Sequence, residues 1–268
     1  MVPIISTVKN GNIVCLSADE NIVVADIQGI TETDAYINTS QRIDGRGEIA
    51  SSAGLRARNI VMTVYLKNDV KEGRELLYDQ FPCGDNIKLI VSSYDESLSI
   101  DGHVESVKGD LFKERQAIQI SIICPFPLFK LYNTETQQEI YIATRILGGQ
   151  PTPVRRTPYT SGCEFMIVSS TPFSVVAISY KNKTLQTGLS SGGVQSLSIK
   201  SYYNDKRIVG HPIDDVVPGS EWISFVGGVS DVTVSIYKVI DGLREEFTAA
   251  EYEATTIWTK EPECKGGI

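Results

Sequence analysis

Residues 188–192 read GLSSG and match the pattern G-x-S-x-G, in which the central serine can act as a nucleophile. A nucleophile elbow needs a strand before the turn, a helix after it, and then an aspartate followed by a histidine. Here the next residues, VQSLSIKSYY, alternate as a strand does, and His211 precedes Asp214 and Asp215. The sequence therefore favours a glycine–serine loop around Ser190, and a serine hydrolase is the weakest of the alternatives.

A second pair of residues with possible acid–base chemistry lies in SIDGHVESV. His103 precedes Glu105 by two residues, so a strand would place both side chains on one face. Proton transfer in an active site needs a nucleophile or third group beside such a pair, and the sequence positions none. We interpret His103 as a half-exposed strand residue beside a solvated carboxylate. We predict no catalytic residue and no enzyme activity.

Metal and thiol chemistry is also disfavoured. The five cysteines stand at positions 15, 83, 124, 163 and 264, with no C-x-x-C and no zinc-like spacing, and there are only two histidines. Cys124 ends the strand-like run QISIIC before Pro125 and Pro127, and no histidine or second cysteine lies nearby to activate it. We expect reduced, structural cysteines, no metal site and no cofactor.

Arginines gather in QRIDGRGEIASSAGLRARN, residues 41–59. Arg42, Arg46, Arg56 and Arg58 could bind phosphate or an acidic partner. Acidic residues are interleaved with these arginines, which favours a solvated loop that contacts another subunit. The sequence predicts a candidate subunit-interface loop here.

Carbohydrate binding would require exposed aromatic side chains in the second half of the chain. Tyr202, Tyr203 and Trp222 are candidates for stacking on a glycan. Most aromatic residues of a β-sandwich lie in its core, and spacing does not separate the two cases. A carbohydrate-binding module that contacts cell-wall glycans therefore stays open as an alternative.

Charge and hydropathy limit the other classes of function. The net charge of −8 disfavours a nucleic-acid clamp, which needs clustered basic residues. No apolar run is long enough to span a bilayer, and the N-terminus lacks the pattern of a signal peptide. We expect a protein made in the cytoplasm, with no membrane segment.

Period-two alternation predicts a mainly β protein. The expected strands span 59–67, 86–93, 96–109, 115–124, 163–170, 173–180, 194–203, 222–228 and 231–239. One helix is expected within 68–82, with Asn68 or Asp69 as its N-cap and Pro82 as its end. Asp101-Gly102 reads as a turn, 129–162 as a crossing between domains with one possible strand at 139–147, and the polar tail from Trp258 as a flexible end. The expected domains are 1–131 and 132–268.

The order of these elements resembles a known family. The motifs are Arg58 with Ile60 in a strand, Arg74 with Leu76 in the helix, Gly102 with Val104 and Glu105 in a hairpin, and Pro125 with Phe126 after the closing strand. Residues 217–239, VPGSEWISFVGGVSDVTVSIYKV, are similar to the family's terminal loop and strand, with Glu221 where asparagine is common. Together they resemble the distal tail protein of long, non-contractile-tailed phages.

The resemblance implies an architecture and a role. The N-terminal domain would be β-barrel-like, with one short α-helix and a β-hairpin, and would form a hexameric ring. A galectin-like β-sandwich would follow it. The protein would be a structural hub of the virion tail tip that joins the tail tube protein to baseplate and receptor-binding proteins. DNA would pass through the ring lumen without specific binding.

Overall fold

The computed structural model describes residues 3–9, 11–42, 48–93, 96–109, 116–156, 161–188, 193–202, 205–210, 216–225 and 228–266. The chain divides into two compact units: unit 1 holds residues 1–139 and 265–268, and unit 2 holds residues 140–264. The boundary expected near residue 131 lies inside a strand of unit 1, Phe129–Asn133. The division into two independently folding domains, 1–131 and 132–268, stays a prediction.

Unit 1 is built from antiparallel strands and an α-helix. In chain order they are β1 (Ile4–Lys9), β2 (Asn12–Cys15), a 3-10 turn (Leu16–Ala18), β3 (Ile22–Gln28), β4 (Ala35–Gln41), β5 (Glu48–Leu55), β6 (Arg58–Leu66), α1 (Val70–Gln80), β7 (Asn86–Ser93), β8 (Glu96–Gly109), β9 (Ala117–Cys124), β10 (Phe129–Asn133) and β11 (Gln138–Glu139). A short strand near the chain end, β24 (Cys264–Lys265), pairs with β10.

The main sheet of unit 1 runs in the order β2-β1-β7-β8-β9-β6-β3, with β10 beside β8. Within the described residues β2 and β3, at the two ends of this order, do not pair, so the expected barrel-like closure is corrected to an open antiparallel sheet. The mainly β prediction is confirmed. The physical reason for the difference is that alternation predicts strands and their buried faces, whereas closure depends on pairings between strands far apart in the chain.

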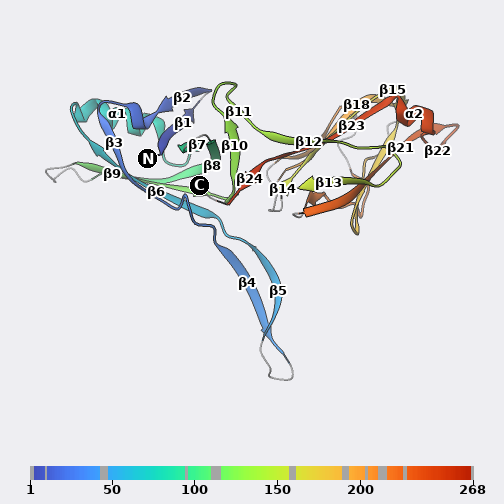
Figure 1. Ribbon diagram of the computed structural model, residues 1–268, viewed down its shortest axis with the longest axis horizontal. Coiled ribbons are helices and arrows are strands. Elements are labelled where there is room, and N and C mark those ends of the chain that lie inside the picture. Colours follow the sequence, from blue (N-terminus) through green and yellow to red (C-terminus); the bar gives the residue numbers. More distant parts are fainter. Residues whose placement is uncertain are drawn as a thin grey trace. The chain divides into compact units, whose positions relative to one another are not determined.

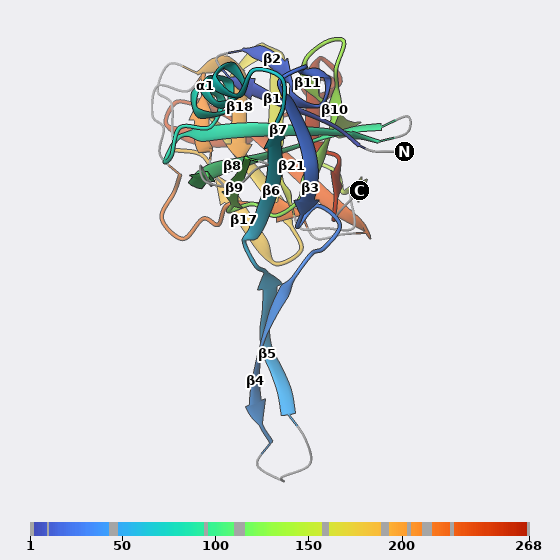
Figure 2. The same cartoon turned by 90° about the vertical axis from the view of Figure 1, so that its left-hand side faces the viewer.

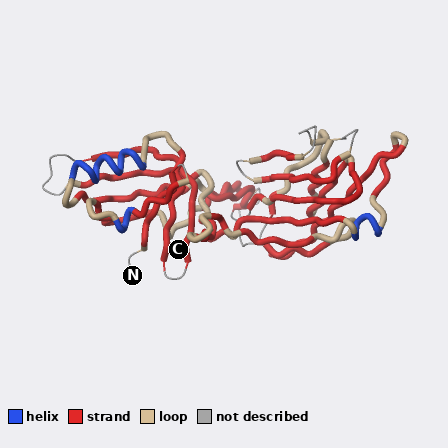
Figure 3. The backbone as a smooth tube through the Cα atoms, turned by 90° about the horizontal axis from the view of Figure 1, so that it is seen from above, coloured by secondary structure: helices blue, strands red, loops and turns tan. Residues whose placement is uncertain are grey.

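Alternating side chains build the core of unit 1. Met62 of β6 faces Ile120 of β9 in register, and both are fully buried. Leu77 and Phe81 enter the same core from α1 and its C-cap, and Figure 3 shows the helix lying along the strands of unit 1. The predicted helix is confirmed, with Asp69 as its N-cap: the carboxylate accepts hydrogen bonds from the backbone N–H groups of Lys71 and Glu72 at 2.9 and 3.0 Å.

The hairpin expected at Asp101-Gly102 is wrong. Residues Glu96–Gly109 form one continuous strand, β8, which pairs with β7 and β9. Gly102 lies in this strand because there is no room for a side chain: a Cβ on Gly102 would lie 2.6 Å from Ile122 Cγ2. The Asp-Gly dipeptide thus marks a close approach of two strands rather than a turn.

A long two-stranded hairpin replaces the loop expected at 41–59. β4 and β5 pair from Ala35↔Leu55 to Gln41↔Glu48 and form a sheet of their own. Figures 1 and 2 show this hairpin projecting away from the rest of unit 1. Except for Gly54, every residue of the two strands is exposed. These strands could not be predicted from the sequence, because neither face is buried and their residues therefore show no apolar alternation.

Unit 2 contains the remaining elements. They are β12 (Tyr141–Arg145), β13 (Thr152–Arg156), β14 (Ser161–Gly162), β15 (Glu164–Phe173), β16 (Val175–Tyr180), β17 (Lys183–Gln186), β18 (Val194–Ser201), β19 (Lys206–Val209), β20 (Ser224–Phe225), β21 (Gly228–Ile240), β22 (Leu243–Glu246), α2 (Ala249–Glu253) and β23 (Thr255–Pro262).

Two antiparallel sheets of unit 2 pack around one core as a β-sandwich. One sheet has the order β12-β23-β15-β18-β19, and the other has β13-β21-β16-β17 with β22 beside β21. Ile167 and Ile257 from the first sheet and Ile178 and Val234 from the second belong to one buried cluster. The predicted sandwich architecture agrees with this arrangement.

Two expectations about this half of the chain are wrong. The crossing 129–162 holds more strands than the one expected, including β10 and β13. The tail is not a free end: β23 pairs with both β12 and β15, and Ile257 and Thr259 are buried. Side chains along β23 alternate, with Ile257 and Thr259 buried and Trp258 exposed. The many polar residues of this segment nevertheless favoured the interpretation as a flexible end.

Candidate assembly surface

The β4–β5 hairpin has two different faces. Cross-strand pairs Ala35↔Leu55 and Ile37↔Ala53 share one face, because side chains alternate along a strand. Near the hairpin base this face is apolar, and Ile37 is 63% exposed. Farther out the same face carries the polar pair Gln41↔Glu48, and the opposite face carries Ile49, which is 53% exposed. On the other face Tyr36 covers Gly54, and Asn38 donates a hydrogen bond to Ser52 at 2.8 Å. An isolated two-stranded hairpin is marginally stable in water, so the apolar face is a surface that can gain from a partner.

The four arginines of the predicted interface loop are placed differently from one another. Arg42 is exposed directly after β4, and Arg56 is exposed directly after β5, where its N–H donates to the Asp34 carbonyl at 2.9 Å. Arg46 lies outside the described residues. Arg58 begins β6 and is only 5% exposed. Its side chain therefore serves the interior of its own unit, and the subunit-contact role of the set stays a prediction.

Arg58 is the centre of a buried polar cluster. Its Nε donates to the Pro127 carbonyl at 2.8 Å, Nη1 donates to the Gly29 carbonyl at 2.6 Å, and Nη2 donates to Thr33 Oγ1 at 2.8 Å. The guanidinium carbon lies 4.9 Å from the centre of the Phe129 ring. A buried cation is tolerated only when it is paired in this way. The sequence analysis did not predict this cluster, because the hydrogen-bond partners of Arg58 lie far from it in the sequence.

An ion-pair network joins β7, β8, β10 and β11. Lys130 Nζ lies 2.9 Å from Asp101 Oδ2 and 3.1 Å from Glu139 Oε1, and Lys88 Nζ lies 3.0 Å from Asp101 Oδ1 and also contacts Glu139. Burial opposes the ionised form of Asp101, but Lys130 and Lys88 outweigh it and lower the pKa of this carboxyl. Burial likewise opposes the charge of Lys130, but Asp101 and Glu139 raise its pKa. The network has two charges of each sign and fixes strands rather than a ligand.

The residues considered for catalysis are not assembled into a site. His103 is exposed on β8, and the Glu105 carboxylate accepts a hydrogen bond from Ser121 at 2.7 Å. Ser190 and His211 lie outside the described residues. Cys124 is fully buried, and burial raises the pKa of its thiol to about 12, against the smaller opposing effect of Arg58. A thiol held protonated in this way is a core side chain rather than a nucleophile.

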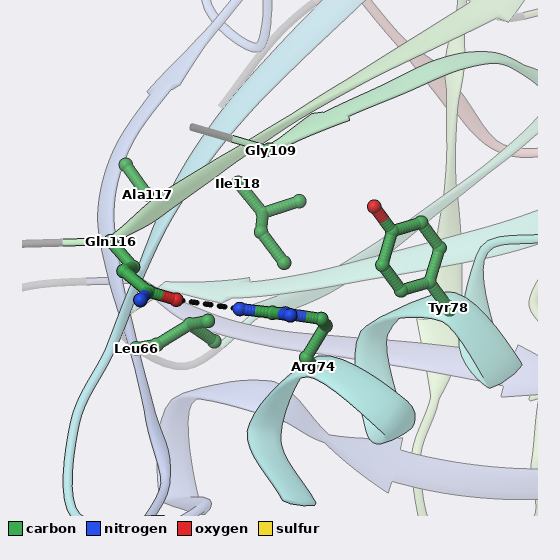
Figure 4. A pocket seen from close by; sticks show the side chains of 7 residues that line it. All are labelled: Leu66, Arg74, Tyr78, Gly109, Gln116, Ala117 and Ile118. Carbon is green, nitrogen blue, oxygen red and sulfur yellow. Dashed lines mark hydrogen bonds between the residues drawn. The ribbon is translucent and has the colours of Figure 1, made fainter. Parts of the chain in front are cut away.

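A small hollow lies between α1 and the start of β9. Figure 4 shows Arg74 and Tyr78 projecting from the helix, with Arg74 towards Gln116, and Arg74 Nη2 donates to Gln116 Oε1 at 2.6 Å. The cavity volume is about 10 Å³. That is about the minimum space for one water molecule, so the hollow does not accommodate a substrate.

The aromatic residues predicted to contact glycans are mostly inward. Trp222 is partly buried and packs against the core of unit 2, and the Tyr202 hydroxyl is buried. Tyr203 lies outside the described residues. Exposed aromatic rings occur instead at Trp258, which is 40% exposed, and Tyr141, which is 39% exposed. The one sequence signal for the exposure of Trp258 is that Ile257 and Thr259, on either side of it, point inward, so that Trp258 must point outward in a strand.

The described ranges contain neither a metal-ligand cluster nor a membrane-spanning helix. In these ranges no three histidine, cysteine, aspartate or glutamate side chains come together as metal ligands. Neither described helix has the length and hydropathy of a membrane span.

Comparison with known proteins gives a fold. No protein-family model matches the sequence, and no curated protein matches it. The SPP1 Dit protein, whose crystal structure is described as a paradigm of the hub adsorption apparatus in phages that infect Gram-positive hosts, matches with a TM-score of 0.66 and 14% identity, over 98% of this chain and 99% of that chain. The chain has the distal tail protein fold. The resemblance inferred from the order of its motifs is confirmed at this level.

Two structures of a phage baseplate also match. A chain of the phage P2 baseplate in its activated conformation matches in the Ca and Sr forms, with TM-scores of 0.51 and 0.52 and 8% identity, over 100% of both chains. The fold is thus shared with baseplate chains that have few residues in common with this one. Buried alternation along the strands can be kept while individual side chains change.

Proposed function

We propose that this protein is a structural hub of a phage or prophage tail tip, which forms a ring that joins the tail tube to the proteins of host adsorption. The observation that carries the proposal is the projecting β4–β5 hairpin with its apolar face, on a chain with the distal tail fold. Such a ribbon gains stability by lying on another protein surface. Of the predicted interface arginines, Arg42 directly follows β4 within the hairpin, and Arg56 directly follows β5 at its base.

The ring is a homohexamer built from unit 1, and unit 2 is a galectin-like sandwich. The partners of the protein are further copies of the same chain, the tail tube protein, and the baseplate and receptor-binding proteins. DNA passes through the lumen, and the net charge of −8 is compatible with a surface that does not bind DNA. The protein's work consists of interfaces, and we assign it no catalytic residue or cofactor.

Adjacent residues on opposite faces of the hairpin provide the test. Ile37→Asp places a charge on the apolar face, whereas Asn38→Asp places the same charge on the polar face. Light scattering and electron microscopy of the wild-type chain should detect rings or concentration-dependent association. Ile37→Asp should abolish this association and Asn38→Asp should retain it. A wild-type chain that stays monomeric even when mixed with its tail tube protein would overturn the hub proposal.

A second candidate function is contact with host cell-wall glycans through unit 2. The supporting observation is the exposure of Trp258 and Tyr141 at β23 and β12, with Lys260 Nζ 5.3 Å from the centre of the Tyr141 ring. Exposed rings beside a polar donor suit stacking on a sugar. Sedimentation with purified host cell walls should show binding that Trp258→Ala removes and Trp222→Phe keeps. Equal binding by both variants would contradict it.

A further inference from the structure

The projecting hairpin is attached to unit 1 through two short connections. Residues 29–34 lead into β4, and residues 56–57 lead out of β5 into β6. Because the hairpin strands are exposed along their length, burial does not set their direction. Contacts at the two connections must therefore hold the hairpin where it leaves the sheet.

Arg58 links both connections. It is the first residue of β6, on the outgoing side, and its guanidinium binds Gly29 and Thr33 on the incoming side at 2.6 and 2.8 Å. Gly29 comes so close that a Cβ there would lie 2.1 Å from the Asn59 carbonyl oxygen. One rigid, permanently charged fork thus spans the base of the hairpin.

The same cluster contains a residue from the far end of the sequence. The Gly266 carbonyl accepts hydrogen bonds from Arg58 Nη2 and from Thr33 Oγ1. Gly266 is placed there by β24, which pairs with β10, and by an ion pair between Lys265 and Glu96. Both hairpin-base side chains therefore share one acceptor that only the returning segment supplies.

From this geometry we infer that Arg58 couples the segment Lys265–Gly266 to the β4–β5 hairpin, so that the base of the hairpin is held only while this segment is in place. Without Gly266, Thr33 loses its acceptor and the buried Arg58 side chain loses a charged hydrogen bond, which is costly. The consequence for ring assembly rests on the proposed function: a subunit whose returning segment is displaced presents a loosened hairpin to its neighbour.

The test compares two truncations of the 268-residue chain, one ending at Cys264 and the other at Gly266. Hydrogen exchange is measured at the Arg56 amide, which closes the hairpin base on Asp34, and at the amides of β8 and β9 as a control for global folding. The chain ending at Cys264 should exchange about tenfold faster at Arg56, the equivalent of one charged hydrogen bond. The chain ending at Gly266 keeps an acceptor for Arg58, now a terminal carboxylate, and should exchange at Arg56 no faster than the full chain, and β8 and β9 should be unchanged in both.

A double-mutant cycle assigns the coupling to Arg58. In an Arg58→Met background, truncation to Cys264 should no longer alter exchange at Arg56. The inference fails if truncation leaves exchange at Arg56 unchanged in the wild type, or if its effect persists fully in the Arg58→Met background. Should Arg58→Met lose protection in β8 and β9, Arg58→Lys, which keeps the charge but not the fork that reaches Gly29, Thr33 and Gly266 together, decides by the same criterion. All measurements use dilute monomer, so their outcome is independent of whether rings form.

Discussion

Gly102 of β8 lies against the thiol of Cys124 at the end of β9, so closely that a Cβ on Gly102 would be 2.8 Å from the sulfur. Real Cβ contacts are not this short, so a side chain at 102 must displace Cys124 or Ile122 in the core. We expect Gly102→Ala to lower the free energy of unfolding by about 1–3 kcal/mol, the usual cost of overpacking.

Gly109 provides the matched control for this substitution. It lies in the same strand, and a Cβ there would be 3.7 Å from its nearest neighbours, an ordinary contact. Gly109→Ala should change the free energy of unfolding by less than about 0.5 kcal/mol. Urea unfolding of both variants measures the difference, and equal stabilities would show that the sheet accommodates a side chain at 102.

The Lys88–Asp101–Lys130–Glu139 network predicts a loss of stability in acid. The folded-state pKa of Asp101 lies below its ordinary value of 3.8, so its contribution is present above that value and is lost as the pH falls through the folded pKa. Because about half of the side chain is exposed, water screens the interaction, and Asp101→Asn should cost only about 1 kcal/mol at pH 7. The variant should also show less acid sensitivity than the wild type.

Glu75→Gln is the control for this prediction, because Glu75 and Lys71 form a fully solvated pair on α1. This variant should change the free energy of unfolding by less than about 0.5 kcal/mol at pH 7. Urea unfolding at a series of pH values provides the measurement, and identical acid slopes for Asp101→Asn and the wild type would refute the role of Asp101.

The hydrogen bonds of Tyr252 lead us to expect that the folded protein loses stability at alkaline pH. Its hydroxyl accepts from the Ile236 N–H at 2.9 Å and donates to Glu246 at 3.0 Å. Burial raises the pKa of this phenol above its ordinary value of 10.0, and Glu246 adds to the effect, so the contribution is full below pH 10 and is lost as the pH rises towards the folded pKa. Tyr252→Phe leaves the Ile236 amide without this acceptor and should cost about 1–3 kcal/mol at pH 7.

The same measurement on Tyr78→Phe gives the baseline, because Tyr78 is largely exposed on α1. Tyr78→Phe should change the free energy of unfolding by less than about 0.5 kcal/mol at pH 7. Thermal unfolding between neutral and alkaline pH distinguishes the two variants, and an unchanged alkaline loss in Tyr252→Phe would count against the role of its hydroxyl.

The lowered pKa of the Glu251 carboxyl can be tested directly by titration. Its pKa is lowered to about 2, first by the hydrogen bond from Lys238 and then by the backbone N–H of Thr248 in the capping box of α2. Lys238→Met should raise the pKa of Glu251 towards its ordinary value of 4.5, whereas Lys183→Met should not. Carboxyl chemical shifts recorded during an acid titration provide the test. A pKa unmoved by Lys238→Met would show that the cap alone sets it.

Strands with one buried face were predictable. β7 and β8 occur at the residues expected from alternation, because each places side chains such as Leu89 and Ile100 in the core at every second position. β4 and β5 gave no such signal, since Ile37 and its neighbours are exposed on both faces. The periodicity of a sequence records burial within one chain, and a hairpin whose partner lies elsewhere does not produce it.

The polar clusters were beyond sequence reasoning for a different reason. Arg58 was recognised as part of a motif, but its acceptors belong to Gly29, Thr33, Pro127 and Gly266, and no local pattern connects these positions. Asp101 was interpreted as half of a turn, whereas it pairs with Lys88 and Lys130 across the sheet. Such contacts follow from strand order, and strand order is the property that alternation leaves open.

The return of Lys265 and Gly266 to unit 1 has a consequence for biosynthesis. Unit 2 is inserted between two segments of unit 1, so the ribosome releases the last acceptor for Arg58 only after all of unit 2 has emerged. A nascent or prematurely ended chain can form most of the first sheet, but it lacks the contact that holds the hairpin base. The order of translation thereby delays completion of the contacts at the hairpin base until the sandwich has been synthesised.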